Sequence, residues 1–149
     1  MLKKLSLPVI TAALVFGGAS AHAEMNADQL KALIQKANEY GFTYYTEIDI
    51  DDDMSAEIEG WVDATTYAEV QFSATGDKVG EKRKEKKDPY GLSHDALQNT
   101  LRAAAANGLV SFESIDVSKR GHISVEGYTA DKKEKEIKVQ MNQVAPPAR

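Results

Sequence analysis

The sequence predicts an α+β fold of two tandem α-β-β-β units, with the helices packed on one face of an antiparallel sheet. Two observations predict this fold. Residues 26–72 align with residues 93–139 without a gap at a shift of 67 residues, which marks an internal repeat. Within each copy, apolar residues first recur at helical spacing and then alternate with polar residues in three successive segments. Each copy is therefore expected to contribute one helix and three strands.

The internal repeat rests on identical and apolar pairs of residues. The identities are Asp28/Asp95, Leu30/Leu97, Ala37/Ala104, Gly41/Gly108, Ile48/Ile115, Asp49/Asp116, Glu59/Glu126, Gly60/Gly127 and Glu69/Glu136. Apolar residues match apolar residues between these positions, and Trp61 matches Tyr128. Chance is not expected to produce an ungapped register that keeps Gly on Gly.

The first 23 residues have the features of a cleaved signal peptide. Lys3 and Lys4 form a positive start, residues 5–16 form a short apolar stretch, and Ala21-His22-Ala23 matches the pattern of small residues at signal peptidase sites. The apolar stretch is shorter than the roughly 20 residues that a membrane-spanning helix needs. With cleavage after Ala23, we expect the chain in the periplasm of a Gram-negative cell, or secreted.

The composition argues against nucleic acid as a partner. Removing the signal peptide takes away Lys3 and Lys4 and changes the net charge from −5 to −7. Non-specific nucleic-acid binding depends on a basic surface, which a chain of this charge does not supply. The sequence contains no Cys, so neither a disulfide nor a thiolate metal site is expected. No further apolar run of membrane length follows, so the chain is not expected to span a membrane.

Each predicted helix has a cap, an apolar stripe and a stop signal. Asn26 and Ser93 are favourable N-cap residues, and Gly41 and Gly108 stand where Gly commonly ends a helix. The apolar stripes comprise Leu30, Leu33, Ile34 and Ala37 in the first copy, and Leu97, Leu101 and Ala104 in the second. Strands are predicted at residues 43–50, 56–63 and 67–74, and again at 110–117, 122–129 and 134–141.

Alternation along the strands divides their residues between two faces of the sheet. One face is apolar and needs cover from the helices, whereas the other is polar, as is common in antiparallel sheets. In the first copy the polar face comprises Glu47, Asp49, Glu57, Glu59, Glu69 and Gln71. Gly60 and Gly127 fall on the apolar face, and we attribute both to the close approach of a helix.

These elements divide the chain into five parts. Residues 1–23 are the signal peptide, 24–79 the first copy, 93–144 the second copy and 145–149 a tail. Residues 80–92 are strongly charged and are assigned to a linker, with an extended edge strand as the alternative.

The order of these features resembles the PepSY domain. The residues that carry the resemblance are Glu59-Gly60-Trp61 and Glu126-Gly127-Tyr128, together with the Thr75-Gly76 turn that closes the first copy. The second copy departs from the pattern, because residues 141–144 lack that Gly turn. The resemblance implies an exported domain without catalytic residues, for which inhibition or modulation of peptidases has been proposed. A tandem of such units is also similar in plan to the β-lactamase inhibitory proteins, which grip an enzyme with an open sheet face.

We therefore expect a periplasmic, non-enzymatic protein-binding module that inhibits or modulates an envelope peptidase or another enzyme. Aromatic residues among acids on an open sheet face are typical of protein-binding patches. The predicted partner-binding residues are Trp61, Tyr67, Tyr128, Glu59 and Glu126. In the alternative interpretation, Trp61 and Tyr128 pack inside the molecule, against each other or against the edge of the second copy.

The alternative function is binding of a cation or a small cationic ligand by the acidic first copy. Asp49, Asp51 and Asp53 reproduce the start of an EF-hand calcium loop, but Met54 stands where that loop needs Gly. The same residues also fit a solvated hairpin turn. The sequence has no nucleophile-with-base pattern and no phosphate-binding Gly loop, so we predict no catalytic residue and no cofactor.

Overall fold

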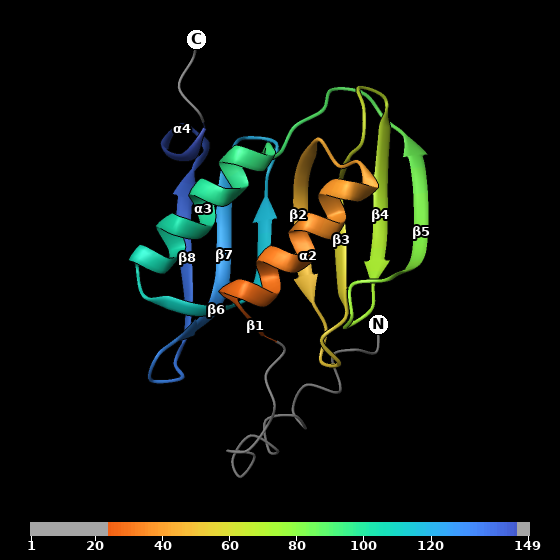
Figure 1. Ribbon diagram of the computed structural model, residues 1–149. Helices are drawn as coiled ribbons and strands as arrows, with labels where there is room; N and C mark the ends of the chain where they lie inside the picture. The colour runs from red at the N-terminus through yellow and green to blue at the C-terminus, as the bar shows by residue number, and fades with distance from the viewer. Residues whose placement is uncertain (1–23, 146–149) are drawn as a thin grey trace, which may run out of the picture.

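Strands dominate the computed structural model, which describes residues 24–145 (Figure 1). The predicted signal peptide, 1–23, and the tail beyond residue 145 lie outside the described residues. The strands are β1 (Met25–Asn26), β2 (Tyr44–Ile50), β3 (Ala56–Trp61), β4 (Thr66–Phe72), β5 (Lys78–Glu85), β6 (Leu109–Val117), β7 (His122–Thr129) and β8 (Glu134–Gln140). The helices are α2 (Ala27–Tyr40), α3 (His94–Ala106) and α4 (Met141–Val144).

All eight strands belong to one antiparallel sheet. Seven of them follow the order β5-β4-β3-β2-β6-β7-β8, and β1 pairs with β6 outside this path. The centre of the sheet is the pairing of β2 with β6, in which Ile48 lies opposite Ile115. This pairing joins the two copies of the repeat, because β2 belongs to the first copy and β6 to the second.

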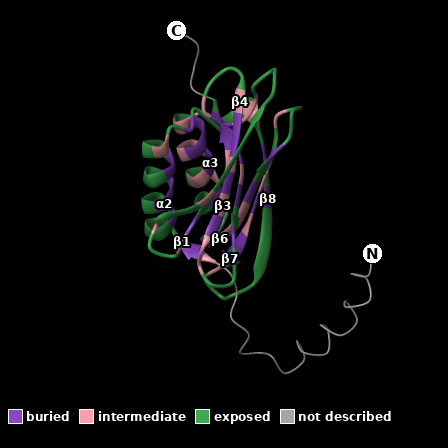
Figure 2. Cartoon of the chain, turned by 90° about the vertical axis from the view of Figure 1, so that its right-hand side faces the viewer, coloured by how far each residue is buried: buried purple, intermediate pink, exposed green. Residues whose placement is uncertain are grey.

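Helices α2 and α3 lie side by side on one face of the sheet (Figures 1 and 2). Helix α2 begins at a capping box, in which the Asn26 side chain accepts from the Gln29 amide and the Gln29 side chain accepts from the Asn26 amide. Helix α3 is capped by Ser93, whose hydroxyl accepts from the Ala96 amide. The core lies between these helices and the sheet, and includes Leu30, Ile34 and Leu97 from the helices and Ile48, Ile58, Val70, Ile115 and Val125 from the strands.

The predicted fold class of two tandem α-β-β-β units is wrong. Residues 24–145 are mostly antiparallel sheet, with 45% strand and 25% helix in three short helices. The strands form one continuous sheet, and β1 and β5 are additional to the three strands predicted for each copy. Self-comparison assigns elements only where both copies carry the same pattern. Strand β1 has two residues, and β5 has charged residues where apolar alternation is expected, so neither produces a signal.

The first residues of the segment assigned to a linker, 80–92, belong to strand β5 at the edge of the sheet, which is the alternative interpretation of this segment. Strand β5 pairs with β4 along its whole length, from Phe72 opposite Lys78 to Thr66 opposite Glu85. The connection that follows β5 then returns across the sheet. Leu92 exchanges both backbone hydrogen bonds with Tyr45, each at 2.8 Å, before α3 begins. Residues 86–92 are therefore tied to the sheet at their far end.

A neighbouring strand leaves no room for a side chain at Gly60 or Gly127. The predicted contact of these two residues with a helix is wrong. A Cβ atom on Gly60 would overlap the carbonyl oxygen of Tyr44, and one on Gly127 would overlap that of Ser111. In both places the register of the neighbouring strand shifts one residue later, at a β-bulge. Both copies of the repeat thus contain a bulge that brings the backbone of one strand close to the Gly of its neighbour.

Candidate functional site

The sheet face opposite α2 and α3 has no helix over it among residues 24–145 (Figure 2). Carboxylates lie at its centre, on the three neighbouring strands β3, β2 and β6. Glu47 pairs with Glu59 on one side and with Asp116 on the other, and Asp49 pairs with Glu57. We call the surface formed by these side chains the acidic face; its members are Glu47, Asp49, Glu57, Glu59 and Asp116.

The alternation of the strands places these carboxylates on the face away from the helices. Ile48 and Ile58 point into the core, where they lie opposite each other, and Ile115 continues the row on β6. Their sequence neighbours must then point to the other side of the sheet, because side chains alternate along a strand. The apolar residues that build the core therefore also determine the position of the acidic face.

Like charges directly opposite each other in a sheet are destabilising, and the pKa values reflect this. Burial raises the pKa of Glu47 from 4.5 to about 7, and contact with Glu59 and the charges of Glu59, Asp116 and Asp49 add to the rise. Burial also raises the pKa of Asp49, with a further contribution from Asp51. The pKa of Glu57 is raised by burial and by the neighbouring Glu59.

Basic side chains neutralise one margin of this surface but not its centre. On the β5 side, Glu69 forms ion pairs with Lys84 and, at 3.8 Å, with Lys82, and the contact with Lys84 lowers the pKa of Glu69. None of the ion pairs within residues 24–145 involves a member of the acidic face. The centre of the sheet thus keeps a concentration of uncompensated carboxylates.

The aromatic residues predicted to bind a partner are buried, in agreement with the alternative interpretation that Trp61 and Tyr128 pack inside the molecule. Trp61 is 1% exposed, and Tyr67 and Tyr128 are each 5% exposed. Trp61 packs edge-on against Tyr67 at 5.5 Å and Tyr90 at 6.5 Å between ring centroids. The ammonium of Lys86 lies 3.6 Å from the centre of the Tyr67 ring. Tyr90 and Lys86 come from the connection after β5, so this connection helps to cover the aromatics.

Tyr67 and Glu59 belong to a hydrogen-bonded network beside the acidic face. The Tyr67 hydroxyl donates to the Glu59 carboxylate at 2.8 Å and lies 2.8 Å from the Thr46 hydroxyl. Thr46 occupies the β-bulge of the first copy. Of the predicted partner-binding residues in the first copy, Glu59 is the one whose side chain stays partly exposed at this surface.

Residues at the corresponding positions of the second copy are acidic. The shift of 67 residues takes Thr46, Glu59 and Tyr67 to Glu113, Glu126 and Glu134. The carboxylate oxygens of these three Glu residues lie within 4.8 Å of one another, close enough to share a cation. Burial raises the pKa of the neighbouring Tyr128 to about 12, with contributions from Glu113 and Glu134.

The predicted metal candidates Asp49, Asp51 and Asp53 do not converge on one point. Asp51 and Asp53 lie in the turn between β2 and β3, where the Ser55 hydroxyl donates to both carboxylates and the Ser55 amide donates to Asp53 at 2.9 Å. Asp49 lies on β2, in the acidic face. Asp51 and Asp53 therefore stabilise a hairpin turn.

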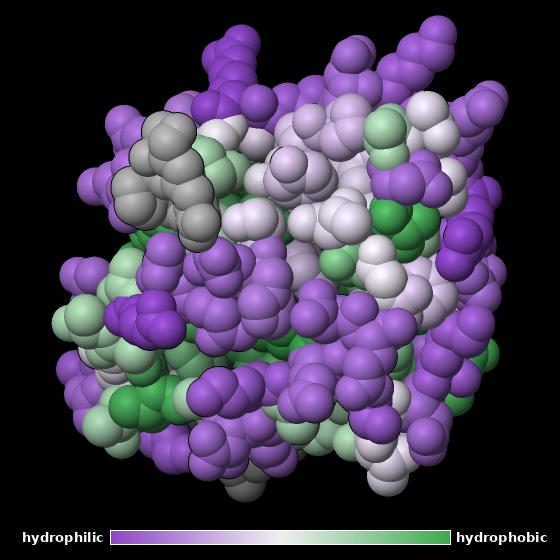
Figure 3. All heavy atoms as spheres, turned by 45° about the horizontal axis from the view of Figure 1, so that its top comes forward, coloured by the Kyte–Doolittle hydropathy of each residue, from purple (hydrophilic) through white to green (hydrophobic). Residues whose placement is uncertain are grey.

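Comparison with known proteins does not assign the chain to a family. No family model, curated protein or solved structure matches the chain. The resemblance to the PepSY domain stays a prediction. Within residues 24–145, none of the helices combines the length and the apolar character that crossing a membrane requires. On the view in Figure 3, hydrophilic side chains cover most of the surface and leave hydrophobic ones in separate patches.

The titration of Glu47 leads to a prediction about stability. The pKa of Glu47 is higher in the folded chain than its ordinary value of 4.5, so the folded state binds the proton more tightly than the unfolded state does. The resulting contribution to stability is present below pH 4.5 and is lost as pH rises through about 7. The facing groups are Glu59 on β3, Asp116 on β6 and Asp49 on the same strand. At pH 8, Glu47→Gln should raise the free energy of unfolding by about 1 kcal/mol, because two like-charged pairs are removed. At pH 5 it should change little.

Urea denaturation at both pH values measures this effect. Glu39→Gln on the exposed side of α2 is the matched control, since it removes the same charge away from the acidic face. An equal effect of Glu47→Gln on the free energy of unfolding at pH 5 and pH 8 would contradict the raised pKa of Glu47.

Proposed function

We propose that the chain is a non-enzymatic protein-binding module whose acidic face binds a basic surface of a protein partner. The observation that carries the proposal is the set of five carboxylates aligned across β3, β2 and β6 on a sheet face that no helix within residues 24–145 covers. Their mutual repulsion costs stability, and a partner that brings Lys or Arg side chains would relieve it. The charge of the surface thus specifies the chemistry of the partner.

The chain itself illustrates the kind of contact that we propose. Lys82 and Lys84 of β5 pair with Glu69, and Lys86 lies on the Tyr67 ring. Basic side chains therefore already cover the margin of the same sheet face. At the centre of the acidic face, we propose that basic side chains of the partner make the equivalent contacts. If the predicted export to the periplasm holds, the partner is a cell-envelope protein, and the PepSY resemblance makes envelope peptidases the first class to test.

A crosslinker placed within the acidic face tests the proposal. Ser114 lies opposite Asp49 on β6 and is partly exposed, so a photoreactive amino acid at this position would contact a bound partner. Ala105, exposed on α3, is the control position on the opposite side of the molecule. We expect one predominant envelope protein to be crosslinked from Ser114 and not from Ala105, through a segment with positive net charge.

Charge variants decide whether the acidic face carries the binding. The triple variant Glu47→Gln, Glu59→Gln and Asp116→Asn should weaken the purified complex at least tenfold, and high salt should weaken the wild-type complex in the same direction. The matched control removes three exposed charges elsewhere, with Glu39→Gln, Asp52→Asn and Glu85→Gln. Equal affinity of the two triple variants would refute the proposal.

Calorimetry distinguishes the protein-binding proposal from the second hypothesis, in which the first copy binds a cation or a small cationic ligand. That hypothesis requires a saturable heat with Ca²⁺ that Asp51→Asn with Asp53→Asn abolishes. We expect no such heat, because both carboxylates already accept hydrogen bonds from Ser55 within their turn.

A further inference from the structure

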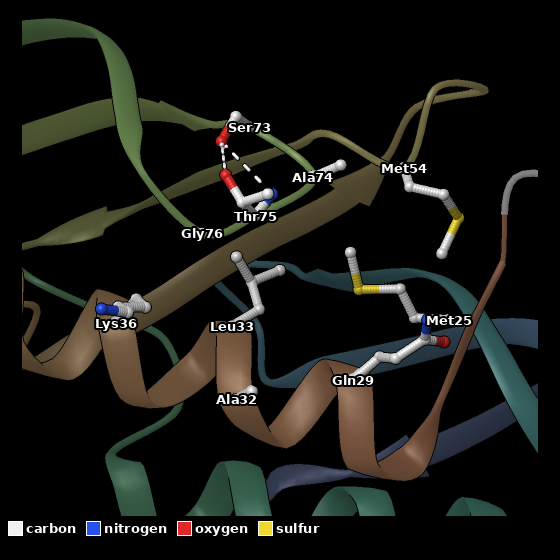
Figure 4. A pocket seen from close by; sticks show the side chains of 10 residues that line it. All are labelled: Met25, Gln29, Ala32, Leu33, Lys36, Met54, Ser73, Ala74, Thr75 and Gly76. Atoms are coloured by element: carbon white, nitrogen blue, oxygen red, sulfur yellow. Dashed lines mark hydrogen bonds between the residues drawn. The ribbon is translucent and has the colours of Figure 1, made fainter.

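A groove on the helix side of the molecule suggests a second binding site. It runs between α2 and the turns that connect β2 to β3 and β4 to β5, and its volume is about 410 Å³ (Figure 4). This volume lies within the range of roughly 300–1,000 Å³ that is common for small-ligand sites. The groove is separate from the acidic face, which lies on the other side of the sheet.

The walls of the groove are mainly apolar. Leu33 and Ala32 line it from α2, Met25 from β1, and Met54 and Ala74 from the two turns (Figure 4). Figure 4 shows the side chains of Met25 and Met54 converging at one end. Methionine adapts its shape to apolar ligands more readily than branched residues do. Met54 holds this place with a backbone φ of 69°, in the left-handed region that non-Gly residues rarely adopt.

The other end of the groove carries a free positive charge. Lys36 lines that end from α2 and forms no ion pair with any of residues 24–145 (Figure 4). Its side chain is exposed, and its stem passes Gly76, where a Cβ would lie 3.3 Å from the Lys36 Cγ. The nearby Asp77 accepts a hydrogen bond from Thr75 at 2.9 Å. The groove therefore has an apolar end and a cationic end.

We propose that this groove binds a medium-chain fatty acid, with its carboxylate at Lys36 and its alkyl tail between Met25 and Met54. The apolar walls take up the methylenes, and the unpaired ammonium selects an anionic head group. Asp51, Asp52 and Asp53, which directly precede Met54 in the turn, keep the head group away from the methionine end. The orientation of the ligand is thus determined by the charges at the two ends.

Methyl NMR of the protein labelled at its methionines tests this site. Sodium decanoate, below its critical micelle concentration, should shift the Met25 and Met54 signals saturably and leave Met141 on α4 unchanged. Hexanoate should bind at least tenfold more weakly, since each buried methylene contributes about fourfold in affinity. Decyltrimethylammonium has the same tail with the opposite charge and should also bind at least tenfold more weakly.

Variants of Lys36 identify the role of the charge. Lys36→Glu should weaken decanoate binding about tenfold, whereas Lys31→Glu, on the same helix but outside the groove, should not. Both residues are exposed, so both variants are expected to fold. Equal binding of decanoate and decyltrimethylammonium, equal effects of the two variants, or shifts at Met141 as large as those at Met25 would each overturn the proposal.

Discussion

Replacing Gly60 or Gly127 by Ala is expected to destabilise the protein by about 3 kcal/mol or more. The added Cβ would overlap the carbonyl oxygen of Tyr44 or of Ser111. Both obstacles are backbone atoms of a neighbouring strand, so rotation of a side chain cannot relieve the overlap. Relief requires the two strands to separate at the bulge. Urea denaturation followed by circular dichroism measures the loss, and each variant should either unfold at lower urea or fail to fold.

Gly80→Ala is the matched control for these two substitutions. Gly80 also lies within a strand, on the edge strand β5, and a Cβ there would lie 3.1 Å from the side-chain oxygen of Gln71, which can move. We expect a change of less than about 1 kcal/mol. If Gly60→Ala were as stable as Gly80→Ala, the close approach of the backbones at the bulge would be refuted.

Trp61→Ala should destabilise the protein by about 3–5 kcal/mol, the range found when a buried aromatic residue is truncated. Trp61 is among the largest fully buried side chains of the protein and contacts the rings of Tyr67 and Tyr90. Its loss would leave a cavity under the connection that follows β5. Because the sequence contains one Trp, the unfolding of this variant has to be followed by circular dichroism.

Tyr44→Ala provides the comparison for Trp61. Tyr44 lies directly opposite Trp61 in the β2–β3 ladder and is 41% exposed. Its truncation should cost less than about 1 kcal/mol. A Trp61→Ala variant as stable as Tyr44→Ala would contradict the burial of Trp61. The same reasoning excludes Trp61→Ala as a test of partner binding, because loss of the fold would remove binding for an unrelated reason.

The separate helices and most strands could be predicted from the sequence because their signals are local. Asn26 and Gln29 lie three residues apart and form the capping box of α2. Strands β2, β3 and β4 begin and end within two residues of the segments predicted from alternation. In each case the residues that determine the element lie inside it or next to it.

The assembly of these elements could not be predicted in the same way. Strand β5 is held by its pairing with β4, and its own residues are mostly charged. The pairing of β2 with β6 joins residues far apart in the sequence, such as Ile48 and Ile115. Periodicity indicates which face of a strand is apolar, but it does not indicate which strand lies beside it.

The candidate site could be predicted only in part, because alternation shows the face on which a residue lies but not what covers it. Alternation placed Glu47, Asp49, Glu57 and Glu59 on the face away from the helices, where the structure has them. It could not indicate that Tyr90 and Lys86, from outside the repeat, contact Trp61 and Tyr67 on that face. Asp116 could have been added, because it aligns with Asp49 and so has the same parity.

The central pairing of β2 with β6 has a geometric consequence. Ile48 and Ile115 occupy corresponding positions of the repeat and lie opposite each other in antiparallel strands, so an approximate two-fold axis passes between them. The backbone of the repeated strands follows this axis, but the side chains break it, with Thr46 and Tyr67 on one side and Glu113 and Glu134 on the other. A molecule that settles on the axis therefore meets different chemistry after a half-turn. The proposed partner is therefore expected to bind in one orientation, with one molecule on each chain.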